Sequence, residues 1–257
     1  MNYLRKSGLS GSSLKIIALI SMLIDHTGAV LVLQMIRHLG GTTSMTLEAY
    51  QAFMSEYSWL VSLYDIMRLV GRLAFPLFCF LLVEGFLHTR HLSRYIRNLG
   101  IFALISEPCF DLALHNCLLE FSSQNVFFTL FLGILTLYGI RQIEERLPNL
   151  QYTIALILKL AVIAVGCLLA LWLKTDYDAY GILCISLMYL FRAHRELSFG
   201  AGCVPLVFLS SSQFFSFLGL PLIWAYNGKR GLSLKYIFYA FYPVHLLLLH
   251  LITILII

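Results

Sequence analysis

Residues 14–33 are apolar and long enough to cross a membrane as one helix, yet they contain Asp25 and His26 beyond the midpoint. Ionisable groups at that depth cost of order ~3 kcal/mol on insertion scales, so they usually face a polar interior or a water-filled cavity. On a helical wheel Lys15 and His26 lie within roughly 20° of each other, about three turns apart. With Lys15 at the membrane surface, His26 lies roughly 16 Å deep. This face is therefore predicted to bind an anion at its mouth and to carry out proton chemistry at its floor.

The rest of the chain is equally apolar. Hydrophobic residues make up 60% of the 257 positions and charged residues 12%, and the mean hydropathy is +0.83. Such a chain is too apolar for a soluble domain and too long for a single span. The apolar runs are continuous rather than alternating, which favours helices over a transmembrane barrel. We expect an all-α, polytopic bundle that forms one membrane-embedded domain, without a cleavable signal peptide.

Basic residues set the expected orientation. Arg5 and Lys6 precede the first span and the basic stretch 88–97 follows the second, which places the N-terminus in the cytoplasm. Residues 45–65 are predicted to form an interfacial helix. Residues 200–226 form either one span or, as we favour, a hairpin bent at Ser210–Ser212. We predict eight or nine spans, at 14–33, 66–88, 98–114, 124–140, 152–173, 180–191, 200–226 and 235–257.

Several functional classes find no support in the sequence. The six cysteines are scattered without a C-x-x-C pair or metal-ligand spacing, so no metal site is expected. The net charge of +5 comes from Lys and Arg in short loops, and nucleic acid is not an expected partner. Motifs of serine hydrolases, P-loop NTPases, zincins and dinucleotide-binding enzymes are absent.

His26 is the strongest candidate for chemistry. It is either a general base, since its ordinary pKa near 6.5 suits proton transfer at neutral pH, or a histidine hydrogen-bonded within the bundle for packing. Asp25 points about 100° away and is expected to orient another group. In the last span Pro243 leaves a carbonyl free one turn back. Tyr242 and His245, spaced i and i+3, are then predicted to line a polar pocket.

Two further pairs of charged residues share helix faces. Arg68 and Arg72 are spaced i and i+4, as are Glu107 and Asp111. These are either structural ion pairs, or an arginine binds an anionic ligand or stabilises an oxyanion. Glu84 near the end of the second span is either structural or reaches toward the interface.

The basic stretch after the second span also has two interpretations. Its arginines set topology and contact anionic lipids, or they receive the phosphates of a nucleotide-containing substrate. The side chains that we assign to such phosphates are Lys15, Arg90, Arg94, Arg97, Lys229 and Arg230.

A series of short motifs runs along the whole chain in order. They are Leu14–Ala18 with Met22–Gly28, Gly71–Phe78 with Val83–Phe86, Ser106–Asp111, Gln124–Thr129, Asp176–Gly181, Tyr226–Gly231 and Phe241–His245. Together they resemble the TraX family of bacterial inner-membrane proteins. That resemblance implies a multi-pass inner-membrane acyltransferase that uses acetyl-CoA, as in N-terminal acetylation of conjugative pilin. A distant similarity to type-three membrane acyltransferases points the same way, although Glu84 stands where that family has serine.

On this basis we expect acetyl-CoA to enter from the cytoplasm and His26 to act directly on the acceptor or through an acetyl-histidine. The acceptor is a protein N-terminus, a lipid or a glycan, and membrane lipids surround the protein. The predicted catalytic residues are His26, Asp25, Arg72, His245 and Tyr242. The predicted structural polar core is Arg68, Glu84, Glu107, Asp111 and Asn125. Two alternatives are a proton-coupled transporter or flippase that relays protons through Asp25, His26, Glu107 and Asp111, and a non-catalytic pilus-assembly protein.

Overall fold

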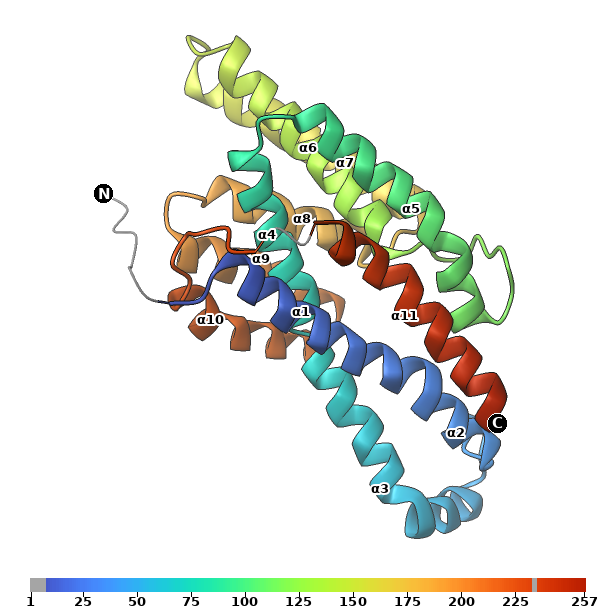
Figure 1. Cartoon of the computed structure of the whole chain (residues 1–257). Helices are drawn as coiled ribbons and strands as arrows, with labels where there is room; N and C mark the ends of the chain where they lie inside the picture. Colours follow the sequence, from blue (N-terminus) through green and yellow to red (C-terminus); the bar gives the residue numbers. More distant parts are fainter. Residues whose placement is uncertain (1–7, 233–234) are drawn as a thin grey trace.

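The computed structural model describes residues 8–232 and 235–257, and every regular element within these ranges is helical (Figure 1). The predicted all-α class is therefore confirmed, whereas Arg5 and Lys6 lie outside the described residues. Five helical stretches in the described part are long and apolar enough to cross a membrane. They are Gly11–His38, Leu47–His88, Val126–Arg146, Tyr152–Leu173 and Ile237–Ile256. Length and composition thus identify five candidate crossings among the described residues, fewer than the eight or nine predicted.

The first stretch is continuous but changes its helical type. Helix α1 (Gly11–His26) is capped by Ser10, whose hydroxyl accepts a hydrogen bond from the backbone N–H of Ser13 at 3.2 Å. It passes into a π-helix, η1 (Thr27–Val32), and then into α2 (Leu33–His38). Because π-helical turns inside α-helices occur often at functional sites, the switch directly after His26 marks this position.

The next stretch differs from the prediction. Helix α3 (Leu47–Gly71) runs through the expected interfacial segment with a kink at Tyr57, and α4 (Ala74–His88) follows after a break at Arg72. The expected boundary near residue 66 was therefore wrong. The reason is that α3 buries its apolar residues Phe53 and Leu60 against η1 and α2 rather than against an interface.

Helix α4 lies at the centre of the bundle. It packs against α1, α6, α8 and α9, and its Leu77, Cys79 and Phe86 are fully buried. Around it α5 (Leu92–His115), α6 (Val126–Arg146), α7 (Tyr152–Leu173) and α8 (Asp178–Leu190) follow one another, each packed on the next (Figure 1). A helix that is apolar on all sides suits this central place.

Residues 195–226 form a hairpin. Helix α9 (Arg195–Leu209) ends at Ser210, and the chain returns along it as a 3-10 helix, η2 (Ser211–Gly219), and α10 (Leu220–Trp224). The segment after the hairpin pairs with the start of α1. There the backbone N–H groups of Gly11 and Ser12 donate to the carbonyls of Lys229 and Arg230 at 2.8 and 2.9 Å.

The last helix, α11 (Lys235–Ile256), packs against α1 and η1 on one side and against α5 on the other (Figure 1). It brings residues 241–245 beside the end of α1, although the two segments are far apart in sequence. This crossing builds the site described next.

Candidate functional site

A pair of histidines joins α1 to α11. The Nδ1 atom of His26 lies 2.7 Å from the Nε2 atom of His245, and the two rings stack with centroids 4.9 Å apart. On the far side of His245, its Nδ1 lies 2.7 Å from the carbonyl oxygen of Phe241, one turn earlier on α11. The three groups form a hydrogen-bonded chain that ends at His26.

The chain of acceptors fixes where the protons lie when both rings are neutral. A carbonyl oxygen only accepts, so the Nδ1 of His245 carries a proton and donates it to Phe241. The Nε2 of His245 is then an acceptor, and His26 donates to it from Nδ1. The Nε2 atom of His26 consequently keeps a free lone pair. Such an atom can take a proton from an amine or a hydroxyl.

Tyr242 packs against both imidazoles. Its ring meets those of His26 and His245 edge-on, each with a centroid distance of 5.8 Å. Phe127 of α6 packs on the other side of Tyr242 with a centroid distance of 5.2 Å. Of the predicted catalytic residues, the structure therefore brings His26, His245 and Tyr242 together.

Asp25 faces a different helix from its neighbour. One oxygen accepts a hydrogen bond from the guanidinium of Arg68 at 2.7 Å, and the two side chains are 18% and 26% exposed. The contact requires Gly71, because a Cβ at that position would lie 2.1 Å from the Asp25 carboxylate. The side chain of Asp25 thus contacts Arg68 of α3, whereas that of His26 contacts His245 of α11. The two directions agree with the predicted angle of about 100° between neighbouring residues of a helix.

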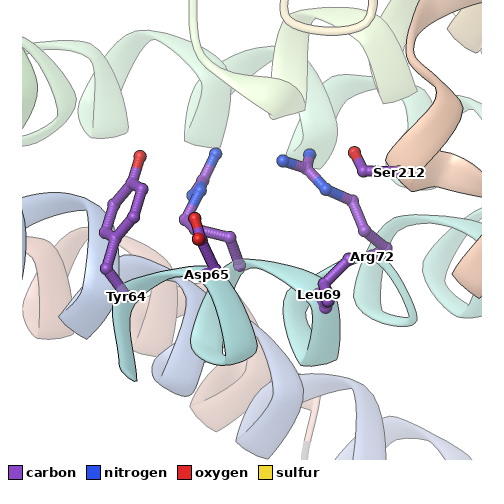
Figure 2. A pocket seen from close by; sticks show the side chains of 6 residues that line it. Tyr64, Asp65, Leu69, Arg72 and Ser212 are labelled. Carbon is purple, nitrogen blue, oxygen red and sulfur yellow. The ribbon is translucent and has the colours of Figure 1, made fainter. Parts of the chain in front are cut away.

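Arg72 does not join the histidine pair. It sits at the break between α3 and α4 and lines a pocket of about 450 Å³ (Figure 2). The residues around this pocket are Tyr64, Asp65, Arg68, Leu69, Arg72 and Ser212. Arg68 belongs to both sites, because it lines the pocket and also donates a hydrogen bond to Asp25.

The turn between α7 and α8 brings Asp176 near Asp25, Arg68 and Arg72. Burial and the charge of Asp25 together raise the pKa of Asp176 to about 6, against the opposing charges of Arg68 and Arg72. The backbone of Asp176 is held by Gln124 and by the hydroxyl of Thr129.

Three residues near this turn, Lys174, Tyr177 and Asp178, have positive φ angles of 54°, 67° and 43°. Residues other than glycine adopt this conformation rarely, and functional sites are enriched in it. The motif Asp176–Gly181 pointed to this turn in the sequence, but it did not mark Asp176 as a site residue. Tyr64 and Ser212 in the pocket carried no signal of their own.

Three of the basic residues assigned to phosphates, Lys15, Lys229 and Arg230, lie near the start of α1. The Lys15 ammonium lies over the Phe238 ring of α11, 5.1 Å from its centroid, and Arg230 is close enough to repel it. Lys15 and His26 therefore both face α11, as the helical wheel predicted. Arg90, Arg94 and Arg97 are exposed around the start of α5, and α5 also packs on α11.

Arg68 forms a structural ion pair, with Asp25, whereas the described partners of Glu107 and Asp111 are not arginines. Glu107 accepts from the backbone and side-chain N–H groups of Asn125, which also caps α6, and Asp111 accepts from the backbone of Glu120 at 2.8 Å. Both acids thus hold the α5–α6 connection. Glu84 accepts a hydrogen bond from the hydroxyl of Tyr226 at 3.2 Å. These acids have structural partners away from the histidines.

The fold and the site together define a helical membrane protein with a histidine pair in its interior and an arginine-lined pocket beside the α3–α4 break. The profile of the family described as TraX protein matches residues 10–253, so the chain belongs to the TraX family. It is also similar to a protein of Dichelobacter nodosus named "Probable fimbrial assembly protein FimC, serogroup H1". The two are 31% identical over 272 aligned positions, which cover 95% of this chain and 96% of the relative. No solved structure matches the chain at a significant level.

Proposed function

We propose that this protein is a membrane acetyltransferase that moves an acetyl group from acetyl-CoA to an amine or hydroxyl acceptor, with His26 as the general base. The observation that carries the proposal is the hydrogen-bonded chain from the Phe241 carbonyl through His245 to His26. It leaves a lone pair on the Nε2 atom of His26 and fixes the ring, as a general base requires.

In this reaction the Nε2 atom of His26 takes the proton of the acceptor. The acceptor nitrogen or oxygen attacks the thioester carbonyl, the carbon–sulfur bond breaks, and His26 returns the proton to the departing thiolate. His245 accepts a hydrogen bond from His26 and stabilises the imidazolium that forms between these steps. A positioned base of this kind contributes about 10²- to 10⁴-fold to the rate.

Binding of the acyl donor is assigned to the basic end of α1. Lys15 and His26 face the same helix and lie about 16 Å apart along α1. A nucleotide-bearing thioester can therefore bind its phosphates at Lys15, Lys229 and Arg230 and extend along α11 toward His26. Arg90, Arg94 and Arg97 add positive charge from the start of α5.

We assign the orientation from the distribution of charge and the acceptor from the name of the relative. Lys15, Lys229 and Arg230 lie near the start of α1, which supports a cytoplasmic N-terminus in a bacterial inner membrane. In this orientation α5, α8 and the α9–α10 hairpin are additional membrane-embedded segments. Because the relative is named for fimbrial assembly, we assign a pilin N-terminus as the first acceptor to examine, before lipids and glycans.

The test is a comparison of cell envelopes. Cells that produce the wild type, His26→Ala or no protein are grown with isotopically labelled acetate, and their envelope proteins, lipids and glycans are analysed by mass spectrometry. We expect one acetylated species that requires both the protein and His26. Acetylation that persists with His26→Ala contradicts the proposal. Pilus assembly that needs the protein but survives loss of His26 and His245 favours a scaffold, and proton-driven uptake into vesicles favours a transporter.

A further inference from the structure

The pocket beside the α3–α4 break is built to donate hydrogen bonds. Two guanidinium groups and two hydroxyls, those of Arg68, Arg72, Tyr64 and Ser212, line it together with Asp65 and Leu69. In Figure 2 the ends of the Tyr64, Arg72 and Ser212 side chains point into the same space. The volume of about 450 Å³ lies within the range of small-molecule sites.

Arg72 has unused hydrogen-bonding capacity in this pocket. Its Nε atom is buried and has no acceptor within hydrogen-bonding distance. Within the described residues, no hydrogen bond or ion pair joins Arg72 to a carboxylate. A guanidinium has five N–H donors and no acceptor, and leaving a buried donor unpaired is costly. This donor set fits a ligand oxyanion.

The nearby carboxylates do not occupy the free N–H donors of Arg72. Asp25 is already bonded to Arg68, and Asp65 is an exposed residue at the edge of the pocket. Asp176 exerts charge on both arginines, but no hydrogen bond or ion pair joins it to either within the described residues. Arg68 also has N–H donors beyond the one that Asp25 accepts.

We propose that this pocket binds an oxyanion, a carboxylate or a phosphate, carried by the acyl acceptor near its reactive amine or hydroxyl. Arg72 and Arg68 bind the oxyanion by charge-assisted hydrogen bonds, and Tyr64 and Ser212 complete the site. The identification of the ligand as the acceptor rests on the proposed function. The existence of the oxyanion site does not.

The position of the pocket supports this assignment. Arg68 connects it to Asp25, which directly precedes His26, and the charge of Arg68 reaches the His26 ring. Arg68 thus links the pocket to the residue next to the base, and we assign the reactive group of an acceptor bound at the arginines to this side of His26. The donor phosphates are assigned to the other end of α1, around Lys15, so the two substrates approach His26 from different directions.

The test measures binding without any acyl donor. Purified full-length protein in detergent is titrated with inorganic phosphate and, separately, with glutarate, at constant ionic strength against chloride. We expect saturable binding of at least one probe and a saturable rise in the unfolding temperature. Phosphate alone points to a phosphate-bearing acceptor such as a lipid headgroup, and glutarate alone to a carboxylate-bearing one. Binding of neither overturns the proposal.

Variants separate this site from non-specific charge. Arg72→Gln is expected to weaken binding about tenfold or more, because a charged donor pair is lost. Arg72→Lys keeps the charge without the planar fork and is expected to fall between Arg72→Gln and the wild type. Arg146→Gln, a matched change at an exposed arginine near the end of α6, is expected to bind like the wild type.

Equal affinity of Arg72→Gln and the wild type would also overturn the proposal. His26→Ala is included because the oxyanion site does not need the base, and this variant is expected to bind both probes as the wild type does. If the wild type binds the probes but transfers no acetyl group, the proposed function fails and the oxyanion site stands. If it transfers acetyl groups but binds neither probe, the oxyanion site fails and the proposed function stands.

Discussion

The Nδ1 atom of His26 contacts the Nε2 atom of His245 at 2.7 Å across 219 residues of sequence. Each histidine is set by its own helix: His26 stands where α1 passes into a π-helix, and His245 is held by the Phe241 carbonyl. The contact therefore depends on how α1 and α11 cross. Any change that shifts this crossing is expected to affect the chemistry of His26.

The first prediction concerns His245. Replacement by alanine removes the acceptor of the His26 proton, so the ring loses its fixed orientation and tautomer. We expect the rate of acetyl transfer to fall about 10²-fold or more, with the fold retained. Transfer at fixed substrate concentrations measures the rate, and circular dichroism checks the fold. A normal rate for His245→Ala would show that His26 works without this partner.

A second prediction concerns the close approach of α1 and α3. In Gly71→Ala the new methyl group would lie 2.1 Å from the Asp25 carboxylate, so Asp25 must move and its bond to Arg68 is strained. We expect a loss of about 1–3 kcal/mol in the free energy of unfolding, as for other overpacked sites. Thermal unfolding in detergent measures it.

Gly200→Ala is the matched control for this change. Gly200 lies within α9, and its added methyl group would have its nearest neighbour at 3.9 Å. Because alanine is the better helix former, a gain of about 0.5–1 kcal/mol is expected there. Similar effects of the two substitutions would argue against a special contact at Gly71.

The third prediction is the strength of the Asp25–Arg68 pair. Both side chains are mostly buried, so a double-mutant cycle with Asp25→Asn and Arg68→Gln is expected to give a coupling energy of about 1–2 kcal/mol. The Arg141–Glu145 pair is the comparison, since its side chains are 37% and 52% exposed. Such exposed pairs contribute about 0.3–0.5 kcal/mol. A smaller coupling for the buried pair would contradict this ranking.

A fourth prediction is a pH dependence of stability caused by Asp176. Its pKa of about 6 exceeds the value of about 3.9 for an unfolded chain, so the folded state prefers the neutral form. The contribution of Asp176 to stability is therefore greatest below about pH 4, falls as the pH rises from about 4 to 6, and then levels off. Burial of the carboxyl group and the negative charge of Asp25 raise the pKa of Asp176, and the positive charges of Arg68 and Arg72 lower it.

Asp176→Asn tests this dependence because asparagine does not ionise. The difference in unfolding temperature between Asp176→Asn and the wild type is expected to shift in favour of the variant between pH 4 and 6 and to stay constant above that range. A difference that is the same at pH 4 and pH 7 would show that Asp176 ionises as freely as in an unfolded chain.

Sequence patterns predicted the features that are set within a single helix. The all-α class, the common face of Lys15 and His26 and the different face of Asp25 follow from hydropathy and helical periodicity, and the structure agrees. Tyr242 and His245 were also predicted as a pair beside Pro243. These features need only the 3.6-residue repeat and the cost of polar groups in an apolar bundle.

Contacts between helices could not be predicted in the same way. The helical repeat gives no information on which acid pairs with Arg68, and the pairing with Asp25 depends on how α1 and α3 pack. Asp176 was not among the predicted site residues, because no local pattern shows that Gln124 and Thr129 hold its backbone. The start of α3 was missed because its packing against α1 and η1 exists only in the folded chain.

The most direct test of the central claim is the rate of transfer from labelled acetyl-CoA by purified wild type, His26→Ala, His245→Ala and the double variant. If His26 is the base and His245 acts through it, His26→Ala and the double variant have the same residual rate, and His245→Ala lies between them and the wild type. Transfer at the wild-type rate by His26→Ala would contradict the account.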